Sequence, residues 1–119
     1  MDLEKLPNKR KAEILKQNYS SWKQTSLDTE GYFPVFSHFK ENFLLRNLSG
    51  NALRLYIYLG LHSKNMTGEC WVTIDTIAKY FDKSNRAVSD WIKELENAKL
   101  IKRMQLQNNG VAFTFLQPY

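Results

Sequence analysis

Residues 73–103 decide the fold, and their sequence is TIDTIAKYFDKSNRAVSDWIKELENAKLIKR. Thr73 and Ser84 have side chains that commonly cap the N-terminus of a helix, and each precedes an amphipathic stretch. Only Asp82 and Lys83 separate the first stretch from the second cap. Two capped amphipathic helices joined by so short a turn form a helix-turn-helix.

Apolar residues recur at helical spacing in both stretches and predict one buried face on each helix. The core-facing residues are Ile74, Ile77, Ala78 and Phe81 in the first helix and, in a second helix from Asn85 to about Ala98, Val88, Trp91, Ile92 and Leu95. We interpret Trp91 as a core anchor against the first helix. An exposed Trp91 would instead stack on bases or dock a partner.

The segment after these helices predicts a β-hairpin. Residues 100–106 alternate, Asn108-Asn109-Gly110 supplies a turn, and residues 111–116 form the returning strand. Upstream, residues 70–72 predict one short strand. The expected fold class is α+β and mainly helical: a winged helix-turn-helix over residues 32–119, with a C-terminal β-hairpin wing and an N-terminal helical extension.

Residues 49–63 fit two structures. Leucines and isoleucine alternate with other residues from Leu53 to Leu61, as in a strand, whereas Ser49 occupies a helix N-cap position before good helix formers. Fifteen residues are long for a strand, so we favour a largely buried helix. In residues 32–45, Pro34 favours an extended start, and three phenylalanines then predict a short core helix over residues 37–45: Phe36, Phe39 and Phe43.

Residues 1–31 predict a separate basic helix and linker. Asn8 is placed to cap a helix through about Lys23, and residues 24–31 are polar and end in glycine. A narrow apolar stripe follows one face of this helix: Ala12, Leu15, Tyr19 and Trp22. The stripe either packs on the domain or binds a partner, and for the second case we assign Leu15, Tyr19 and Trp22 as partner-binding residues.

The composition fits a basic domain. The chain has 17 Lys+Arg against 12 Asp+Glu, a net charge of +5, and the surplus lies mostly near the two ends. Such a charge favours anionic partners, nucleic acid first. The run Lys9-Arg10-Lys11 is the densest basic cluster; it either grips phosphate or forms a solvated helix start.

Several classes of protein do not fit the sequence. No stretch approaches the roughly 18 consecutive apolar residues of a membrane span, and the single cysteine, Cys70, excludes an internal disulfide; a cytoplasmic protein is the default. Glycine-rich phosphate loops and nucleophile elbows are absent, and His38, His62 and Cys70 lack the spacing of metal ligands. We expect no enzymatic activity, no metal and no cofactor.

Residues 73–103 resemble bacterial winged helix-turn-helix DNA-binding domains. The ending Leu95-Glu96-Asn97-Ala98-Lys99-Leu100-Ile101 is similar to their exit from the second helix into the wing. Upstream, Tyr32-Phe33-Pro34-Val35, Asn47-Leu48-Ser49 and Ala52-Leu53-Arg54-Leu55-Tyr56 follow an order similar to the N-terminal domain of plasmid replication initiator A proteins. The resemblance covers about residues 32–117 and implies DNA binding at a replication origin.

In such domains the second helix enters the major groove, so the resemblance implies DNA contacts from this helix and from the base of the wing. The candidates are Ser84, Asn85, Arg86, Ser89, Lys93, Lys102 and Arg103, to which the N-terminal Lys9, Arg10 and Lys11 are added. Chemically, Ser84 and the first helix amides suit a phosphate, Arg86 a guanine and Asn85 an adenine.

The charge of the second helix departs from this pattern. Over residues 84–99, Arg86, Lys93 and Lys99 balance Asp90, Glu94 and Glu96. A neutral helix binds duplex phosphates poorly unless other segments supply charge. Asp90 either pairs with Arg86 one turn away or accepts from a cytosine amino group.

Two functions remain open on this basis. The first is a small DNA-binding protein, an accessory or initiator-like factor in the replication of a plasmid or mobile element. The second is an interaction module that docks a larger replication protein, a helicase or polymerase. Single-stranded DNA binding, transcriptional repression and a homodimer are further alternatives.

Overall fold

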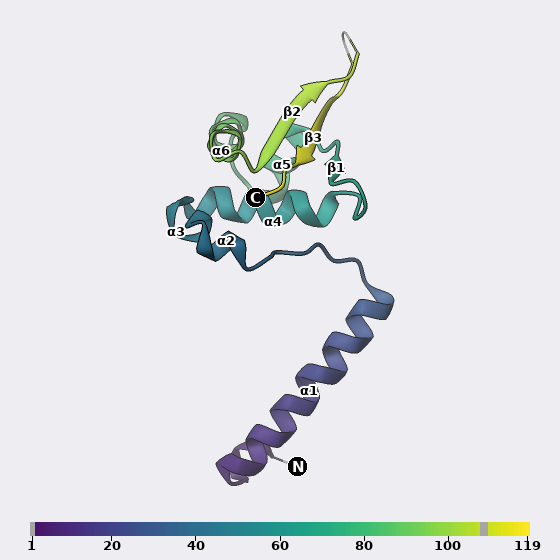
Figure 1. Ribbon diagram of the computed structural model, residues 1–119, viewed down its shortest axis with the longest axis vertical. Helices are drawn as coiled ribbons and strands as arrows, with labels where there is room; N and C mark the ends of the chain where they lie inside the picture. The colour runs from purple at the N-terminus through teal and green to yellow at the C-terminus, as the bar shows by residue number, and fades with distance from the viewer. Residues whose placement is uncertain (1, 108–109) are drawn as a thin grey trace. The chain divides into compact units, whose positions relative to one another are not determined.

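The computed structural model describes residues 2–107 and 110–119 and divides into two compact units, Met1–Tyr32 and Phe33–Tyr119 (Figure 1). The first unit consists of a short 3-10 helix, η1 (Leu3–Lys5), and the long helix α1 (Asn8–Thr29). No residue of α1 is buried. The apolar stripe of this 22-residue helix is therefore not part of a buried core.

Two predictions for this unit are wrong. Pro7, not Asn8, is the N-cap of α1, and no side chain caps the helix. Proline is tolerated at this position because it has no N–H to satisfy, and its φ of −59° with ψ of 150° matches the extended backbone of an N-cap. Residues 24–29 continue the helix instead of forming a linker, because polar residues with no tertiary competitor still form i, i+4 contacts such as Gln24–Asp28.

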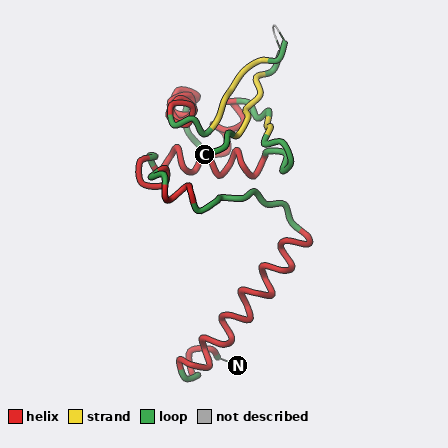
Figure 2. The backbone as a smooth tube through the Cα atoms, in the orientation of Figure 1, coloured by secondary structure: helices red, strands yellow, loops and turns green. Residues whose placement is uncertain are grey.

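The second unit contains six short or medium elements before its hairpin. They are α2 (His38–Glu41), α3 (Leu44–Asn47), α4 (Gly50–His62), β1 (Glu69–Cys70), α5 (Ile74–Phe81) and α6 (Asn85–Asn97). The hairpin consists of β2 (Ile101–Gln105) and β3 (Ala112–Leu116). Figure 2 shows the mainly helical character of the chain, with strands confined to one small sheet.

The predicted helix over residues 37–45 is broken. Phe43 adopts φ 61°, in the left-handed region, and separates α2 from α3. This rotation takes Phe43 out of the line of Phe39, so that Phe39 is buried whereas Phe36 and Phe43 are exposed. The three phenylalanines therefore do not form one core stripe.

Helix α4 confirms the helical interpretation of residues 49–63. The Ser49 side chain accepts a hydrogen bond from the Ala52 N–H at 3.1 Å and caps the helix. The buried residues of α4 cover several faces: Ala52, Leu55, Tyr56, Tyr58, Leu59 and Gly60. Burial on more than one face, together with the exposed Ile57 and Leu61, accounts for the strand-like alternation of the sequence.

The sheet is antiparallel with strand order β1-β3-β2, so β3 is central. Its register pairs Cys70 with Thr114 and Thr114 with Arg103. The first strand is shifted by one residue from the prediction, and Trp71 and Val72 follow it as extended chain. The predicted hairpin strands are present, while Asn108 and Asn109 of the predicted turn lie outside the described residues.

One hydrophobic core joins α4, α5, α6 and the start of the sheet. Leu55, Leu59, Ile77, Val88 and Leu95 are each almost fully buried. Burying a side chain of this size contributes roughly 1.5–3 kcal/mol. The core therefore fixes the inner face of α6 and leaves its other face to solvent.

Candidate nucleic-acid interface

Helices α5 and α6 form the pair that the sequence predicts. Thr73 Oγ1 accepts from the Thr76 N–H, and Ser84 Oγ accepts from the Ala87 N–H, each at 3.1 Å. Between the helices Asp82 adopts φ 54°, and the Lys83 N–H donates to the Ala78 carbonyl at 3.0 Å. Asp tolerates this left-handed conformation better than most residues, so the turn is tight without glycine.

The inner face of α6 is anchored on α4 and α5. Val88, Ile92 and Leu95 are buried, as predicted. Trp91 is half-buried, and its ring meets Phe81 of α5 edge to face, with centroids 5.7 Å apart. Trp91 therefore anchors α6 against α5, which is the role that the sequence favoured for this residue.

The outer face of α6 carries the charged residues. Arg86, Asp90 and Lys93 are exposed and Ser89 is half-buried. No Arg86–Asp90 ion pair forms among the residues that the structure describes. Arg86 is therefore not held by the carboxylate one turn away.

Asn85 is engaged within the protein. Its Nδ2 donates to Oδ1 of Asp75, on α5, at 2.6 Å. This hydrogen bond links the first turns of α5 and α6. The bond occupies one of the two Nδ2 hydrogens, so an adenine contact by Asn85 would use the other hydrogen and Oδ1.

Glu94 faces α4. Its carboxylate accepts two hydrogen bonds from Ser49, from the backbone N–H at 2.7 Å and from the hydroxyl at 2.8 Å. A carboxylate at a helix N-terminus also interacts favourably with the helix dipole. Glu94 therefore joins α6 to α4, and the neutral charge count of α6 overstates the acidity of its outer face.

Lys102 and Arg103 lie on opposite faces of the sheet. Lys102 is exposed, whereas Arg103 is half-buried and its Nη1 donates to Oγ1 of the buried Thr114 at 2.9 Å. Burial lowers the pKa of Arg103, although the nearby Cys70 and Glu96 counteract this shift. Arg103 has a structural bond in the sheet, whereas Lys102 has no ion-pair partner in the described part of the chain.

In the first unit, the basic cluster is partly paired. Arg10 forms an ion pair with Glu13 at 3.0 Å, and Lys11 lies 3.5 Å from Glu4. Lys9 has no ion-pair partner among the described residues. Two of the three predicted phosphate contacts would thus have to leave a carboxylate, at little cost since surface pairs contribute about 0–1 kcal/mol.

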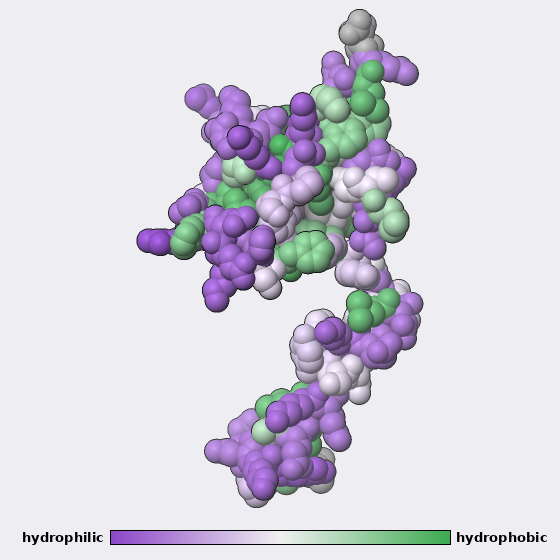
Figure 3. Space-filling view, viewed as in Figure 1, coloured by the Kyte–Doolittle hydropathy of each residue, from purple (hydrophilic) through white to green (hydrophobic). Residues whose placement is uncertain are grey.

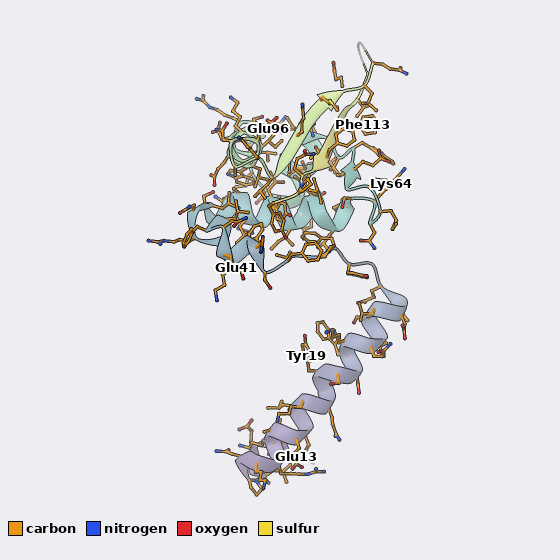
Figure 4. All side chains as sticks on the ribbon, viewed as in Figure 1. Glu13, Tyr19, Glu41, Lys64, Glu96 and Phe113 are labelled. Carbon is orange, nitrogen blue, oxygen red and sulfur yellow. The ribbon has the colours of Figure 1, made fainter. Side chains whose placement is uncertain are left out.

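The apolar stripe of α1 is exposed. Leu15, Tyr19 and Trp22 each expose more than half of their surface, and the Tyr19 and Trp22 rings lie 5.6 Å apart. Figure 4 shows Tyr19 standing out from α1. The structure thus leaves these three side chains accessible to a partner.

The sequence did not single out an aromatic cluster on the sheet. The rings of Trp71 and Phe113 have centroids 5.9 Å apart, and Phe113 and Phe115 lie 6.3 Å apart. Phe113 and Phe115 alternate with Thr114 along β3 and therefore share one face of the sheet. Trp71 lies outside β1, and only the fold brings it beside them.

Comparison with known protein families is consistent with the pair of helices α5 and α6. No helix in the described part of the chain has both the length and the apolar character of a membrane span. A comparison with curated proteins found no match. Residues 46–101, from α3 to the start of β2, match the family model described as a helix-turn-helix domain, which supports a helix-turn-helix DNA-binding domain in this part of the chain.

Proposed function

We propose that Phe33–Tyr119 is a winged-helix DNA-binding module in which α6 enters the major groove and the β2–β3 hairpin is the wing. The observation that carries this proposal is the division of α6 into two faces. Val88, Ile92 and Leu95 hold one face on the core, and Arg86 and Lys93 project from the other. A helix held in this way fits the major groove, which is about 12 Å wide.

Each exposed cation has a chemical role in this proposal. The Arg86 guanidinium contacts a guanine edge through two hydrogen bonds, while Lys93 and Lys102 contact phosphates. The free amides of the first turn of α6 bind a phosphate beside Ser84. Ser89 lies between Arg86 and Lys93 along the helix and contacts the groove wall.

Duplex binding by single-residue variants tests this proposal. Fluorescence anisotropy with labelled duplexes is measured for the full chain, Arg86→Ala and Lys40→Ala. Lys40 on α2 is the matched control because its loss changes the net charge equally outside α5, α6 and the hairpin. We expect a larger loss from Arg86→Ala, and equal losses for the two variants would contradict base or groove contact by α6.

We further propose that the chain acts without enzymatic activity in the cytoplasm, in the replication of a plasmid or other mobile element. The similarity of residues 32–56 to plasmid initiator domains supports this role. Selection of bound sequences from a random duplex library tests it. Repeated direct sites would fit an origin, whereas one two-fold symmetric site would favour a homodimeric transcriptional repressor instead.

The exposed stripe of α1 favours a second candidate function, docking to a larger replication protein. Leu15, Tyr19 and Trp22 share one face, and three lysines at spacings of seven form a row beside them: Lys9, Lys16 and Lys23. Such a face suits an acidic amphipathic helix of the partner. Trp22→Ala in the full chain should weaken capture of a purified helicase or polymerase, and unchanged capture would contradict the assignment.

A further inference from the structure

The outer face of the sheet carries aromatic side chains that the proposed duplex interface does not use. The register places Lys102 and Glu69 on either side of Phe115, and Met104 beside Phe113. Trp71 follows β1 and meets Phe113 with centroids 5.9 Å apart. We call this surface the aromatic sheet face: Glu69, Trp71, Lys102, Met104, Phe113 and Phe115.

The aromatic sheet face is exposed although the opposite face of the sheet is core. On the core side, Cys70 and Thr114 are each 1% exposed. On the aromatic side, Trp71 is 53% and Met104 43% exposed, and Phe113 and Phe115 are half-buried. Figure 3 shows apolar side chains gathered along the hairpin, and Figure 4 shows Phe113 and Lys64 on the side away from Glu96 of α6. Packing of the core therefore does not account for these rings.

Cations border this face. Lys64 Nζ lies 5.4 Å from the centroid of the Trp71 ring and 2.9 Å from Oε1 of Glu69. Lys102 is exposed on the other side of Phe115. Glu69 is the one carboxylate of the face as defined, and Lys64 neutralises it, so the remaining charge is positive.

We propose that the aromatic sheet face binds single-stranded nucleic acid, with bases stacked on Trp71 and Phe113 and with Lys102 on an adjoining phosphate. Aromatic rings bind every base through its π-face, and flanking cations follow the backbone. A neutral apolar partner would gain nothing from the charge of Lys102. This site shares Lys102 with the proposed duplex interface, but it involves no residue of α6.

Oligothymidylate binding by the full chain tests the proposal. We expect the labelled oligonucleotide to bind, and Trp71→Ala to weaken its affinity by about 5- to 150-fold, the equivalent of roughly 1–3 kcal/mol per stacked base. Tyr32→Ala is the matched control because Tyr32 is 54% exposed, an aromatic side chain as accessible as Trp71 that belongs to none of the proposed interfaces. It should leave the affinity unchanged, and Trp71→Phe should restore most of the loss.

The salt dependence of the wild-type affinity for oligothymidylate is a second test. It requires no variant protein. One lysine contact, from Lys102, predicts a slope of log affinity against log salt of about −0.7 for a single strand. The absence of oligothymidylate binding, or a loss caused by Tyr32→Ala and not by Trp71→Ala, would overturn the proposal. A Trp71-dependent self-association without oligonucleotide binding would also overturn it and assign the face to a second copy.

The two interfaces are separable by one comparison. Arg86→Ala should weaken duplex binding and leave oligothymidylate binding unchanged, whereas Trp71→Ala should do the reverse. Failure of duplex binding alone contradicts the proposed function. Failure of Trp71-dependent single-strand binding alone contradicts the aromatic site.

Discussion

Asp90 is the residue that most opposes a nucleic-acid contact by α6. It is exposed on the same face as Arg86 and Lys93, and no ion pair with Arg86 neutralises it in the described part of the chain. If that face meets a duplex, the carboxylate repels phosphate. The affinity of α6 for duplex DNA then depends on Asp90 as much as on Arg86 and Lys93.

Asp90→Asn should therefore raise duplex affinity about 3- to 10-fold at low salt, with the gain shrinking as salt screens the repulsion. The measurement is anisotropy with one duplex over a salt series. Glu96→Gln on α6 is the control for net charge alone. Equal gains from both substitutions would show that Asp90 does not face the duplex, and a loss of affinity would indicate a cytosine contact.

Tyr56 makes the stability of the fold sensitive to high pH. Burial, together with the neighbouring Tyr119, raises the pKa of Tyr56 to about 12. The folded state therefore keeps the phenol protonated where the unfolded chain ionises. This contribution to stability is complete below pH 10 and is lost as pH rises toward 12, at up to about 1.4 kcal/mol per pH unit.

Urea unfolding between pH 8 and 11.5 measures this effect. The wild-type free energy of unfolding should fall above pH 10 more steeply than that of Tyr56→Phe, which has no phenol to ionise. Parallel pH profiles for the two proteins would contradict the raised pKa.

The sequence predicted the roles of short-range residues better than those of residues with distant partners. The caps Thr73, Ser84 and Ser49 act within three residues, so their signal is local. Glu94 bonds Ser49 across 45 positions of the chain. Nothing in the local sequence distinguishes it from a solvated glutamate.

At the scale of elements, α6 and α4 are joined by the two hydrogen bonds from Ser49 to Glu94. Glu94→Ala should lower the free energy of unfolding by about 1–3 kcal/mol because the bonds involve a charged group. Chemical denaturation measures this change, and Glu96→Ala, on the same helix, is the control. A loss no larger than that of the control would contradict the joining role.

Helix α4 also depends on a close approach at Gly60. A Cβ at this position would lie 2.4 Å from the Phe33 ring, so Phe33 would have to move from its edge-on contact with Tyr56. Gly60→Ala should therefore destabilise the fold by about 1–3 kcal/mol despite the better helix propensity of alanine. Its thermal unfolding is compared with that of Gly50→Ala.

Gly50 is the matched control because it lies in the same helix and a Cβ there would meet no atom within 4 Å. Gly50→Ala should be neutral or slightly stabilising. A Gly60→Ala protein as stable as Gly50→Ala would show that Phe33 repacks freely.

Element boundaries differ in how far the sequence determines them. The amphipathic pattern located α5 and α6 closely because caps mark both starts. The break between α2 and α3 depends on Phe43 adopting a left-handed conformation, which its residue type disfavours. The packing of Phe39 in the core overrides the conformational preference of Phe43. A periodic pattern of apolar residues alone predicts a helix that continues through Phe43.

At the scale of the whole molecule, the net charge of +5 is distributed over both units. Some of the basic residues are paired with carboxylates within the protein. Arg10 and Lys11 are paired and Arg103 is half-buried. Among the residues that the structure describes, the candidate site on the second unit therefore relies on three cations without an ion-pair partner: Arg86, Lys93 and Lys102. Sequence counts identified the charged residues, but only the fold separates the exposed ones from those bound within the protein.

The proposed duplex interface consists of α6 and the hairpin, and it is accessible to amide NMR of the full chain during titration with duplex DNA. We predict that the largest chemical-shift changes fall on residues 84–93 of α6 and on β2. Changes confined to residues 2–32, or to the outer surface of α4, would contradict this interface.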